Sequence, residues 1–243
     1  MLQWIRSLTF IVLATVYMPL LGLLYAPWAM FSRRGAYAAC KAYAAGTMWM
    51  AKVIVGLRCE VRGDVPDGAV LVAAKHQSFL DILMIFHILP RAKFIMKREI
   101  LMTPVIGQYA KRMQMVAVNR GKRGAAISKM LADVKAGAAE PGQLVIYSQG
   151  TRVAPGLSVP YKAGTAALYE QMGQPCVPVA TNAGYFWPRS GLYRRPGVAV
   201  VEFQPPIAPG LERAAFMKRL EETVETRSDA LLAEAGFKAP QPR

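Results

Sequence analysis

Short apolar runs alternate with stretches of helical periodicity from residue 57 to about residue 235. A short apolar run bounded by Gly or Pro predicts a buried strand, and apolar residues spaced three or four apart predict a helix. We expect strands at residues 57–61, 70–74, 93–96, 115–118, 143–147, 176–181 and 198–203. We expect helices at residues 79–88, 105–111, 123–136, 163–172 and 212–235. This alternation predicts an α/β fold with a mostly parallel central sheet flanked by helices.

The first 56 residues follow a different pattern. Residues 7–31 contain no charged side chain. At about 1.5 Å per residue, a helix of this length would be about 38 Å long, enough to cross a hydrocarbon core of about 30 Å. Pro19 and Pro27 also allow a bent helix that dips into the bilayer or lies in its surface. Crossing and dipping therefore both stay open.

Basic residues follow this apolar segment at Arg33, Arg34 and Lys41. They predict that its C-terminal side faces the cytoplasm, and with the length of the apolar run they disfavour a cleaved signal peptide. A second apolar segment, at residues 37–57, is rich in Ala and predicts an interfacial helix. We therefore expect a membrane-associated helical segment at residues 1–56, an α/β domain at 57–237 and a flexible tail at 238–243.

The composition favours a membrane surface over nucleic acid as the partner. Of 243 residues, 53% are hydrophobic, and 30 Lys and Arg residues against 15 Asp and Glu give a net charge of +15. Lys and Arg near an anionic bilayer contribute about 1 kcal/mol each, whereas the sequence has no zinc-ligand spacing and no RNA-binding aromatic motif. Cys40, Cys59 and Cys176 are far apart, so we expect buried free thiols in a reducing compartment.

The turn after the strand at 70–74 carries the candidate chemistry. His76 lies on this turn, Ser78 is the expected N-cap of the next helix, and Asp81 is the third residue after the cap. An acidic side chain at that position points back toward the turn. A carboxylate beside an imidazole makes a general base, which needs no protein nucleophile if the substrate supplies a hydroxyl. The alternative stays open that Ser78 and Asp81 form only a capping box and His76 is only a polar residue at a strand end.

Basic and polar residues follow three further predicted strands. They are Lys97, Arg120 and, after the strand at 143–147, the run Gln149-Gly150-Thr151-Arg152. If the strands are parallel, their carboxyl ends bring these residues to the same sheet edge as His76. Guanidinium groups there would form an anion site, and Gly150 would let the backbone approach the ligand closely. Taken singly, each basic residue is better explained as a solvated loop charge, whereas basic residues at three strand ends beside a His–Asp pair favour a site.

Two features further along concern the sheet and its surroundings. Pro178 cannot donate a ladder hydrogen bond, so we expect the strand at 176–181 at a sheet edge, or Pro178 at a bulge or a strand start. Residues 182–188 are expected to form a loop that carries Tyr185, Phe186 and Trp187. These aromatic side chains would line an acyl groove, touch lipid or pack in the core, and the three alternatives stay open.

Four blocks of sequence resemble the 1-acylglycerol-3-phosphate acyltransferases of the glycerolipid acyltransferase superfamily. Residues 75–81 are similar to the family's N-H-x-x-x-x-D, and residues 115–123 to its strand with an Arg-bearing loop. Residues 147–152 are similar to F-P-E-G-T-R, and residues 176–179 to V-P-V. The blocks occur in the family's order, and the resemblance covers about residues 57–205. It implies the glycerolipid acyltransferase fold.

The resemblance also implies a reaction. An acyl group would pass from acyl-CoA or acyl carrier protein, as co-substrate, to the free hydroxyl of 1-acylglycerol 3-phosphate, giving phosphatidic acid in phospholipid biosynthesis. His76 would take the hydroxyl proton and Asp81 would orient His76, with no acyl-enzyme, no metal and no other cofactor. The expected partners are lysophosphatidate, the thioester donor and the anionic surface of the inner membrane, with the catalytic domain facing the cytoplasm.

The same resemblance implies a set of substrate-binding residues. Arg120 and Arg152 would bind the acceptor phosphate, and Lys97 would stabilise the oxyanion. Gly150 and Thr151 would shape the loop that precedes Arg152. The residues are Lys97, Arg120, Gln149, Gly150, Thr151 and Arg152.

Three positions depart from the family pattern. Lys75 stands where the family has Asn, Ser148 where it has Pro, and Gln149 where it has an acid. The exchange at 149 removes a negative charge. It leaves open an acyltransferase for another lyso-lipid, such as lyso-ornithine lipid, and a non-catalytic basic lipid-binding protein of the same fold.

Overall fold

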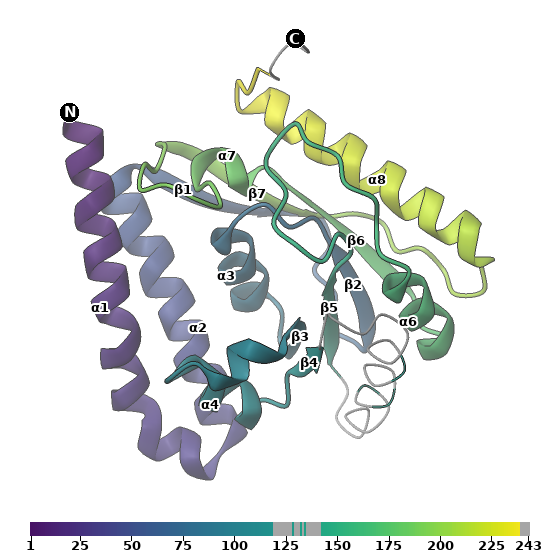
Figure 1. The fold of residues 1–243 in the computed structure, drawn as a ribbon, viewed down its shortest axis with the longest axis horizontal. Helices are drawn as coiled ribbons and strands as arrows, with labels where there is room; N and C mark the ends of the chain where they lie inside the picture. Colours follow the sequence, from purple (N-terminus) through teal and green to yellow (C-terminus); the bar gives the residue numbers. More distant parts are fainter. Residues whose placement is uncertain (119–127, 129–131, 133, 135–141, 239–243) are drawn as a thin grey trace.

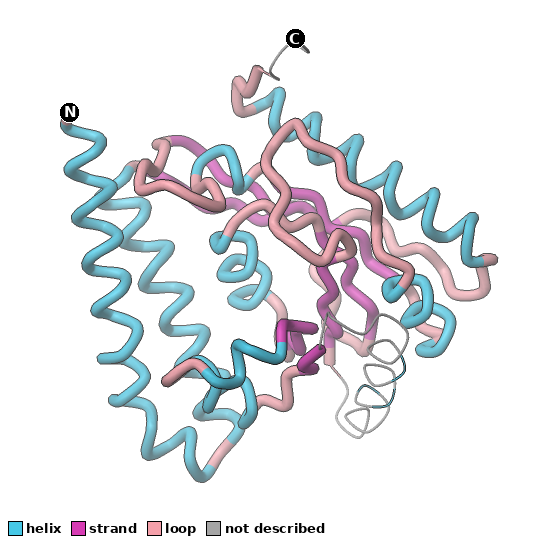
Figure 2. Tube along the Cα trace, in the orientation of Figure 1, coloured by secondary structure: helices cyan, strands magenta, loops and turns pink. Residues whose placement is uncertain are grey.

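Seven strands form one sheet in the order β1-β7-β6-β2-β5-β3-β4, drawn in magenta in Figure 2. All neighbouring pairs are parallel except β6 and β7, which confirms the mostly parallel sheet. The computed structural model describes residues 1–118, 128, 132, 134 and 142–238. Each predicted strand end lies within one residue of an observed end. The strands are β1 (Leu57–Arg62), β2 (Val70–Ala74), β3 (Ala92–Lys97), β4 (Val116–Val118), β5 (Gln143–Tyr147), β6 (Cys176–Thr181) and β7 (Gly197–Phe203).

Helices cover both faces of the sheet (Figure 1). The first three helices pack on one face, and α6 and α8 pack on the other. The predicted helix at residues 123–136 falls largely outside the described residues, and tail residues 239–243 fall wholly outside them. The helices are α1 (Leu2–Phe31), α2 (Arg33–Met50), α3 (Phe79–Ile88), α4 (Ile106–Arg112), α6 (Gly164–Met172), α7 (Ala183–Phe186) and α8 (Arg213–Glu234), with a π-helical turn η1 (Ala51–Val55) and a 3-10 segment η2 (Arg98–Met102).

Strand β2 is buried on both of its faces. Val72 and Ala74 belong to the core beneath α1, α2 and α3, whereas Leu71 and Ala73 belong to the core beneath α6 and α8. Each of these four residues is at most 1% exposed. Because side chains along a strand point alternately to opposite faces, consecutive residues at the end of β2 serve different helical layers.

The helices α1 and α2 form a hairpin beside the sheet (Figure 1). α1 is one continuous helix that passes through Pro19 and Pro27. α2 begins earlier than the predicted segment at 37–57 and continues into η1, which ends where Gly56 adopts a φ of 79°. Gly35 brings the two helices into close contact, because a Cβ atom there would lie 2.7 Å from the backbone carbonyl carbon of Trp28.

α1 is also attached to the α/β domain along much of its length. Near its start, the side-chain amide of Gln3 donates to the carbonyl oxygen of Arg194 at 3.0 Å. Further along, the hydroxyl of Tyr109 donates to the carbonyl oxygen of Gly22 at 2.6 Å. At about 1.5 Å per residue, these two points on α1 lie about 29 Å apart. The helix therefore runs alongside the domain rather than away from it.

Of the positions predicted from Pro178, the sheet edge is wrong. β6 lies between β2 and β7, with Pro178 inside it. The amide of Lys75 on the β2 side donates to the carbonyl of Val179 at 2.9 Å, so Val179 turns its polar groups toward β2 and Pro178 turns its ring nitrogen the other way. On that side the ladder with β7 begins at Val179, and the carbonyl of Pro178 accepts from the amide of Gln204, directly after β7, at 2.9 Å. Pro178 therefore lies at the end of the β7 ladder, where its missing N–H removes a single hydrogen bond.

The aromatic segment after β6 is not a loop throughout, because α7 occupies its centre. Phe186 and Trp187 are buried. The Trp187 ring packs edge-on against Phe10 of α1, with ring centroids 5.2 Å apart. For these two side chains the structure shows core packing, and Tyr185 is half-buried beside them.

The three cysteines are free thiols. Cys176 is buried as predicted, whereas Cys40 and Cys59 are only half-buried. Burial raises the pKa of the Cys176 thiol to about 12.

Replacing Gly35 with Ala should separate α1 from α2 and lower the thermal unfolding midpoint, since the added methyl group meets backbone atoms that cannot rotate away. Overpacking of this kind costs about 1–3 kcal/mol. The matched control is Gly68→Ala, because a Cβ atom at Gly68 has nothing within 4 Å. Equal midpoints for the two variants in detergent would show that the hairpin contact does not depend on Gly35.

Candidate active site

His76 and Asp81 are in direct contact at the carboxyl end of β2. The Nδ1 atom of His76 lies 2.9 Å from Oδ1 of Asp81, which confirms that the carboxylate turns back toward the imidazole. Asp81 is fully buried, whereas the His76 side chain keeps 12% exposure. Among the described residues, Nε2 of His76 has no hydrogen-bond partner. The pair therefore presents one imidazole nitrogen that can accept a proton.

The other oxygen of Asp81 caps helix α3. Its Oδ2 accepts hydrogen bonds from the backbone amides of Gln77 and Ser78, at 2.8 and 2.6 Å. The Ser78 hydroxyl in turn accepts from the amide of Leu80 at 3.0 Å. The two interpretations of this run are therefore not exclusive, since one carboxylate forms the capping box with one oxygen and contacts the imidazole with the other.

Tyr147 at the end of β5 supports the imidazole from one side. Its ring stacks on the His76 ring, with centroids 3.9 Å apart and an interplanar angle of 18°. Burial and the nearby charge of Asp81 raise the pKa of Tyr147 well above its usual value. Tyr147 is therefore neutral at physiological pH and acts as a rigid aromatic surface, which limits the rotation of His76.

The loop after β5 is bonded to the His76 turn. The amide of Val153 donates to the carbonyl oxygen of His76 at 2.8 Å. Gly150 turns the loop with a φ of 70°, a conformation that Gly adopts without strain. Thr151 and Arg152 are half-buried, and the guanidinium of Arg152 has no partner among the described residues. The loop that is bonded to the His76 turn therefore carries a guanidinium group without a described partner.

The parallel strands bring further predicted residues to the same edge. Lys97 is the last residue of β3 and is exposed, and its register partner in β4 is Val118. The strands β2, β5, β3 and β4 are all parallel. Lys97 therefore lies at the edge formed by their carboxyl ends, as His76 and Arg152 do. Arg120 lies outside the described residues, so its predicted role stays a prediction.

Lys75 and Gln149, two of the departures from the family pattern, meet in the structure. Both are buried, at 3% and 1% exposure. Lys75 forms an ion pair with Glu225 of α8, and the Gln149 amide lies 3.5 Å from the same carboxylate. This placement does not support the predicted contact of Gln149 with substrate. The sequence interpretation missed Glu225, because no local pattern in α8 distinguishes it from its exposed acidic neighbours.

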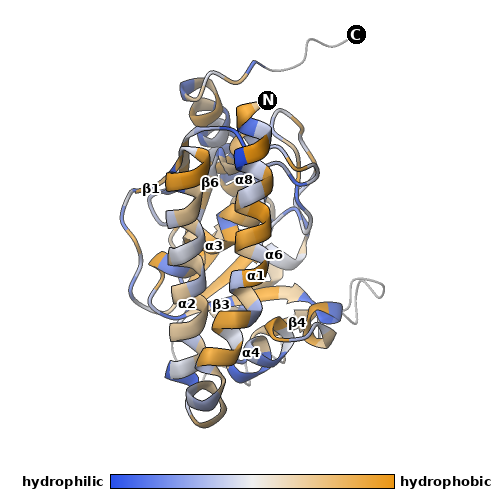
Figure 3. Ribbon diagram, turned by 90° about the vertical axis from the view of Figure 1, so that its left-hand side faces the viewer, coloured by the Kyte–Doolittle hydropathy of each residue, from blue (hydrophilic) through white to orange (hydrophobic). Residues whose placement is uncertain are grey.

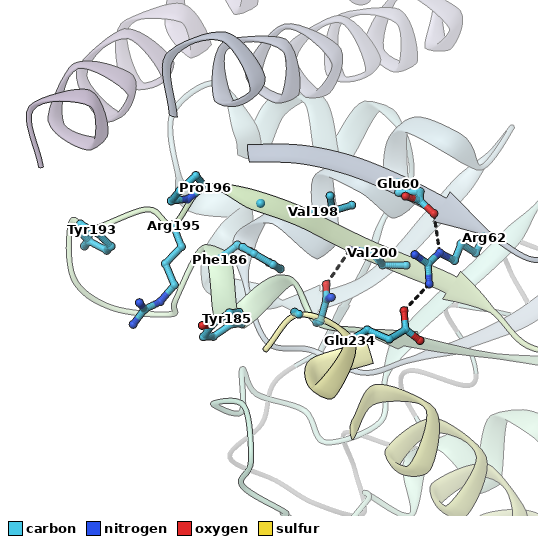
Figure 4. Close-up of a pocket in the computed structure, with 13 residues that line it drawn as sticks. Glu60, Arg62, Tyr185, Phe186, Tyr193, Arg195, Pro196, Val198, Val200 and Glu234 are labelled. Carbon is cyan, nitrogen blue, oxygen red and sulfur yellow. Dashed lines mark hydrogen bonds and ion pairs between the residues drawn. The ribbon is translucent and has the colours of Figure 1, made fainter. Parts of the chain in front are cut away.

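A cavity of about 560 Å³ opens elsewhere, on the α8 side of β7 (Figure 4). Val198 and Val200 of β7 face it, and Arg62 bridges Glu60 and Glu234 at one end. None of the predicted site residues that the structure describes lines this cavity.

Comparison with known proteins identifies the family. The family model described as Acyltransferase matches residues 57–182, which run from β1 to the residue after β6. The chain belongs to the acyltransferase family. The matched range contains His76, Asp81 and the loop at 149–152, so the geometry described above is that of an acyltransferase domain.

Two curated relatives and one solved structure extend this comparison. The chain is 26% identical over 189 residues to a 1-acyl-sn-glycerol-3-phosphate acyltransferase from Pseudomonas aeruginosa, covering 77% of this chain and 74% of the relative. It is 29% identical over 164 residues to the 1-acyl-sn-glycerol-3-phosphate acyltransferase alpha of Mus musculus, covering 65% of this chain and 58% of the relative. The crystal structure of the 1-acyl-sn-glycerophosphate (LPA) acyltransferase PlsC from Thermotoga maritima has the same fold, with a TM-score of 0.78 and 22% identity over 94% of this chain and 95% of that chain.

Exchanging Asp81 for Asn should lower kcat about 10²–10⁴-fold, the range that a positioned general base supplies. The change removes the charge that stabilises the protonated imidazole. The control is Ser78→Ala, which removes only a capping hydrogen bond and should lower stability by about 0.5–2 kcal/mol with little effect on turnover. Equal losses of acyl transfer in the two variants would mean that Asp81 acts only through the helix cap.

Proposed function

We propose that this acyltransferase moves a fatty acyl group from a thioester donor to the free hydroxyl of 1-acylglycerol 3-phosphate, which yields phosphatidic acid. The observation that carries the proposal is the contact between His76 Nδ1 and Asp81 at 2.9 Å, on a sheet edge that also carries Lys97 and Arg152. The names of the curated relatives support this acceptor. Acyl-CoA and acyl carrier protein are both suitable donors, since each presents a thioester.

The proposed reaction is a single transfer of the acyl group from the thioester sulfur to the acceptor hydroxyl. His76 donates its Nδ1–H to Asp81 and accepts the proton of the acceptor hydroxyl at Nε2. The hydroxyl oxygen attacks the thioester carbonyl carbon, and the C–S bond breaks. The leaving thiolate takes the proton from His76, which returns to its neutral state. The products are the ester and a free thiol, and the protein forms no covalent intermediate.

The acceptor phosphate is the expected ligand of the cationic groups at the sheet edge. The Arg152 guanidinium offers a planar fork that suits phosphate oxygens, and its loop is bonded to the His76 carbonyl through Val153. Gly150 and Thr151 shape the loop, and Lys97 supplies a second positive charge. A phosphate bound here would place the glycerol hydroxyl near the imidazole.

The contacts of α1 support a position in the bilayer surface. One described helix, α1, is long and apolar enough to cross a bilayer, and Figure 3 shows apolar residues along most of it. However, the domain is bonded to α1 over about 29 Å, so a crossing helix would draw polar parts of the domain into hydrocarbon. We place α1 in the bilayer surface, with its outer face among the acyl chains. The exposed apolar residues of this face include Leu2, Ile5, Leu8, Val12, Val16, Leu20, Leu23, Leu24 and Phe31.

The net charge of +15 favours the anionic cytoplasmic leaflet of the inner membrane. In this arrangement the acceptor lipid reaches the active site without leaving the bilayer, and the water-soluble donor arrives from the cytoplasm.

An acceptor panel tests the proposed substrate. Lysophosphatidate should be acylated, whereas monoacylglycerol, which lacks the phosphate, should be acylated poorly. Acyl-CoA and acyl carrier protein are compared as donors. Equal turnover of both acceptors by the wild-type protein would exclude a phosphate-dependent site.

The Arg152→Ala variant tests the proposed phosphate ligand. It should raise KM for lysophosphatidate about 10–100-fold, the effect of losing a charged hydrogen bond of about 1.5–3 kcal/mol. The control is Arg219→Ala, an exposed position on α8.

Membrane binding is tested by charging the outer face of α1. The double variant Leu20→Glu/Leu24→Glu places two carboxylates at side chains that are 60% and 74% exposed, so it should fold normally and bind vesicles more weakly. The control is Leu157→Glu, an exposed leucine on a loop of the domain. Co-sedimentation with vesicles of anionic phospholipid gives the comparison. Undiminished binding of the double variant would place the membrane contact elsewhere.

A further inference from the structure

A half-buried carboxylate on α8 contacts residues at the carboxyl ends of β2 and β5, the two strands that carry His76 and the Gly150–Arg152 loop. Glu225 forms an ion pair with Lys75, which directly precedes His76, and accepts a hydrogen bond from Tyr161 at 2.8 Å. The side-chain amide of Gln149, which directly precedes Gly150, lies 3.5 Å from Oε1 of Glu225. One side chain of α8 thus contacts the end of β2, the end of β5 and the loop that follows β5.

These contacts lie on the opposite face of the sheet from the His76–Asp81 pair. The side-chain alternation of β2 continues beyond the strand, because Lys75 reaches α8 and His76 reaches α3. Figure 1 shows these two helices on opposite sides of the sheet. The backbone at residues 75–76 is therefore held from both faces, by Asp81 on one side and by Glu225 on the other.

The burial of this cluster makes its charges interdependent. The Lys75 and Glu225 side chains are only 4% and 20% exposed. Removal of one partner from a buried pair leaves an uncompensated charge, which is far more costly than removal of both. Tyr161 remains a donor to Glu225, because burial and the neighbouring carboxylate both raise its pKa.

We propose that Glu225 is a positioning residue for the acyl transfer: through Lys75 and Gln149 it fixes the two strand ends that carry His76 and the Gly150–Arg152 loop. The inference rests on the proposed function and assigns to α8 a role that none of the matched motifs contains. Glu225 itself touches no reacting atom, since its partners in the structure are Lys75, Gln149 and Tyr161.

The test is a cycle of variants in which the carboxylate is removed, duplicated or exchanged. Glu225→Gln leaves Lys75 without its counter-charge, and Gln149→Glu places two carboxylates about 3.5 Å apart. Each should lower kcat for lysophosphatidate about tenfold or more at a temperature well below unfolding. The combination Gln149→Glu/Glu225→Gln keeps one carboxylate and one amide in the same contact, so it should recover most of the lost kcat. Glu222→Gln, exposed on the same helix, is the control and should behave as wild type.

A second combination separates positioning from stability. Lys75→Met/Glu225→Gln contains no buried unpaired charge, so its thermal unfolding midpoint should return toward the wild-type value while its kcat stays reduced. Wild-type kcat in this variant, or in Glu225→Gln, would overturn the positioning role, as would a combination of Gln149→Glu and Glu225→Gln that is no better than either single variant.

The outcome also distinguishes this inference from the proposed function. If the wild-type protein acylates a different lyso-lipid, the same kcat ratios are measured on that acceptor, and only the proposed substrate is wrong. If it acylates lysophosphatidate and the variants have the same kcat as the wild-type protein, only the role of Glu225 is wrong. If it acylates no lyso-lipid, both proposals fall together.

Discussion

The candidate site depends on the hydrogen bonds and the imidazole contact of one buried carboxylate, that of Asp81. Its two oxygens have separate tasks, since one accepts the amides that begin α3 and the other contacts the His76 imidazole. A fully buried carboxylate is tolerated only when its hydrogen-bonding capacity is filled. The first turn of α3 and the orientation of His76 therefore form together. The local fold thus holds the imidazole in the orientation that the proposed acyl transfer requires.

The end of β2 joins the two helical layers of the protein. Consecutive side chains there point to opposite faces, and each meets a carboxylate carried by a helix, Asp81 from α3 and Glu225 from α8. The two carboxylates are far apart in the sequence. The face of the sheet opposite the His76–Asp81 pair therefore contributes an ion pair formed by the residue that directly precedes His76.

The outer face of α1 is the surface that we propose to contact lipid. α1 is packed on one side against α2 and the domain, and its other side is apolar and exposed. A contiguous exposed apolar surface of this kind marks a contact with membrane or protein. Because the domain is bonded to α1 at Gln3 and at Gly22, the proposed position of the helix in the bilayer would also orient the sheet edge that holds His76.

The sequence by itself determined the elements and the local chemistry. Strand ends were predictable within one residue because the apolar runs are flanked by Gly, Pro, charged or other polar residues. The His76–Asp81 contact was predictable because the two residues lie five positions apart across a single turn. The tertiary structure decided what depends on distant segments. The place of β6 inside the sheet despite Pro178 was decided by its pairing with β2 on one side and β7 on the other, in which only one N–H is missing. The burial of Gln149 against Glu225, and the course of α1 along the domain, result from packing between residues far apart in the chain, which no local pattern records.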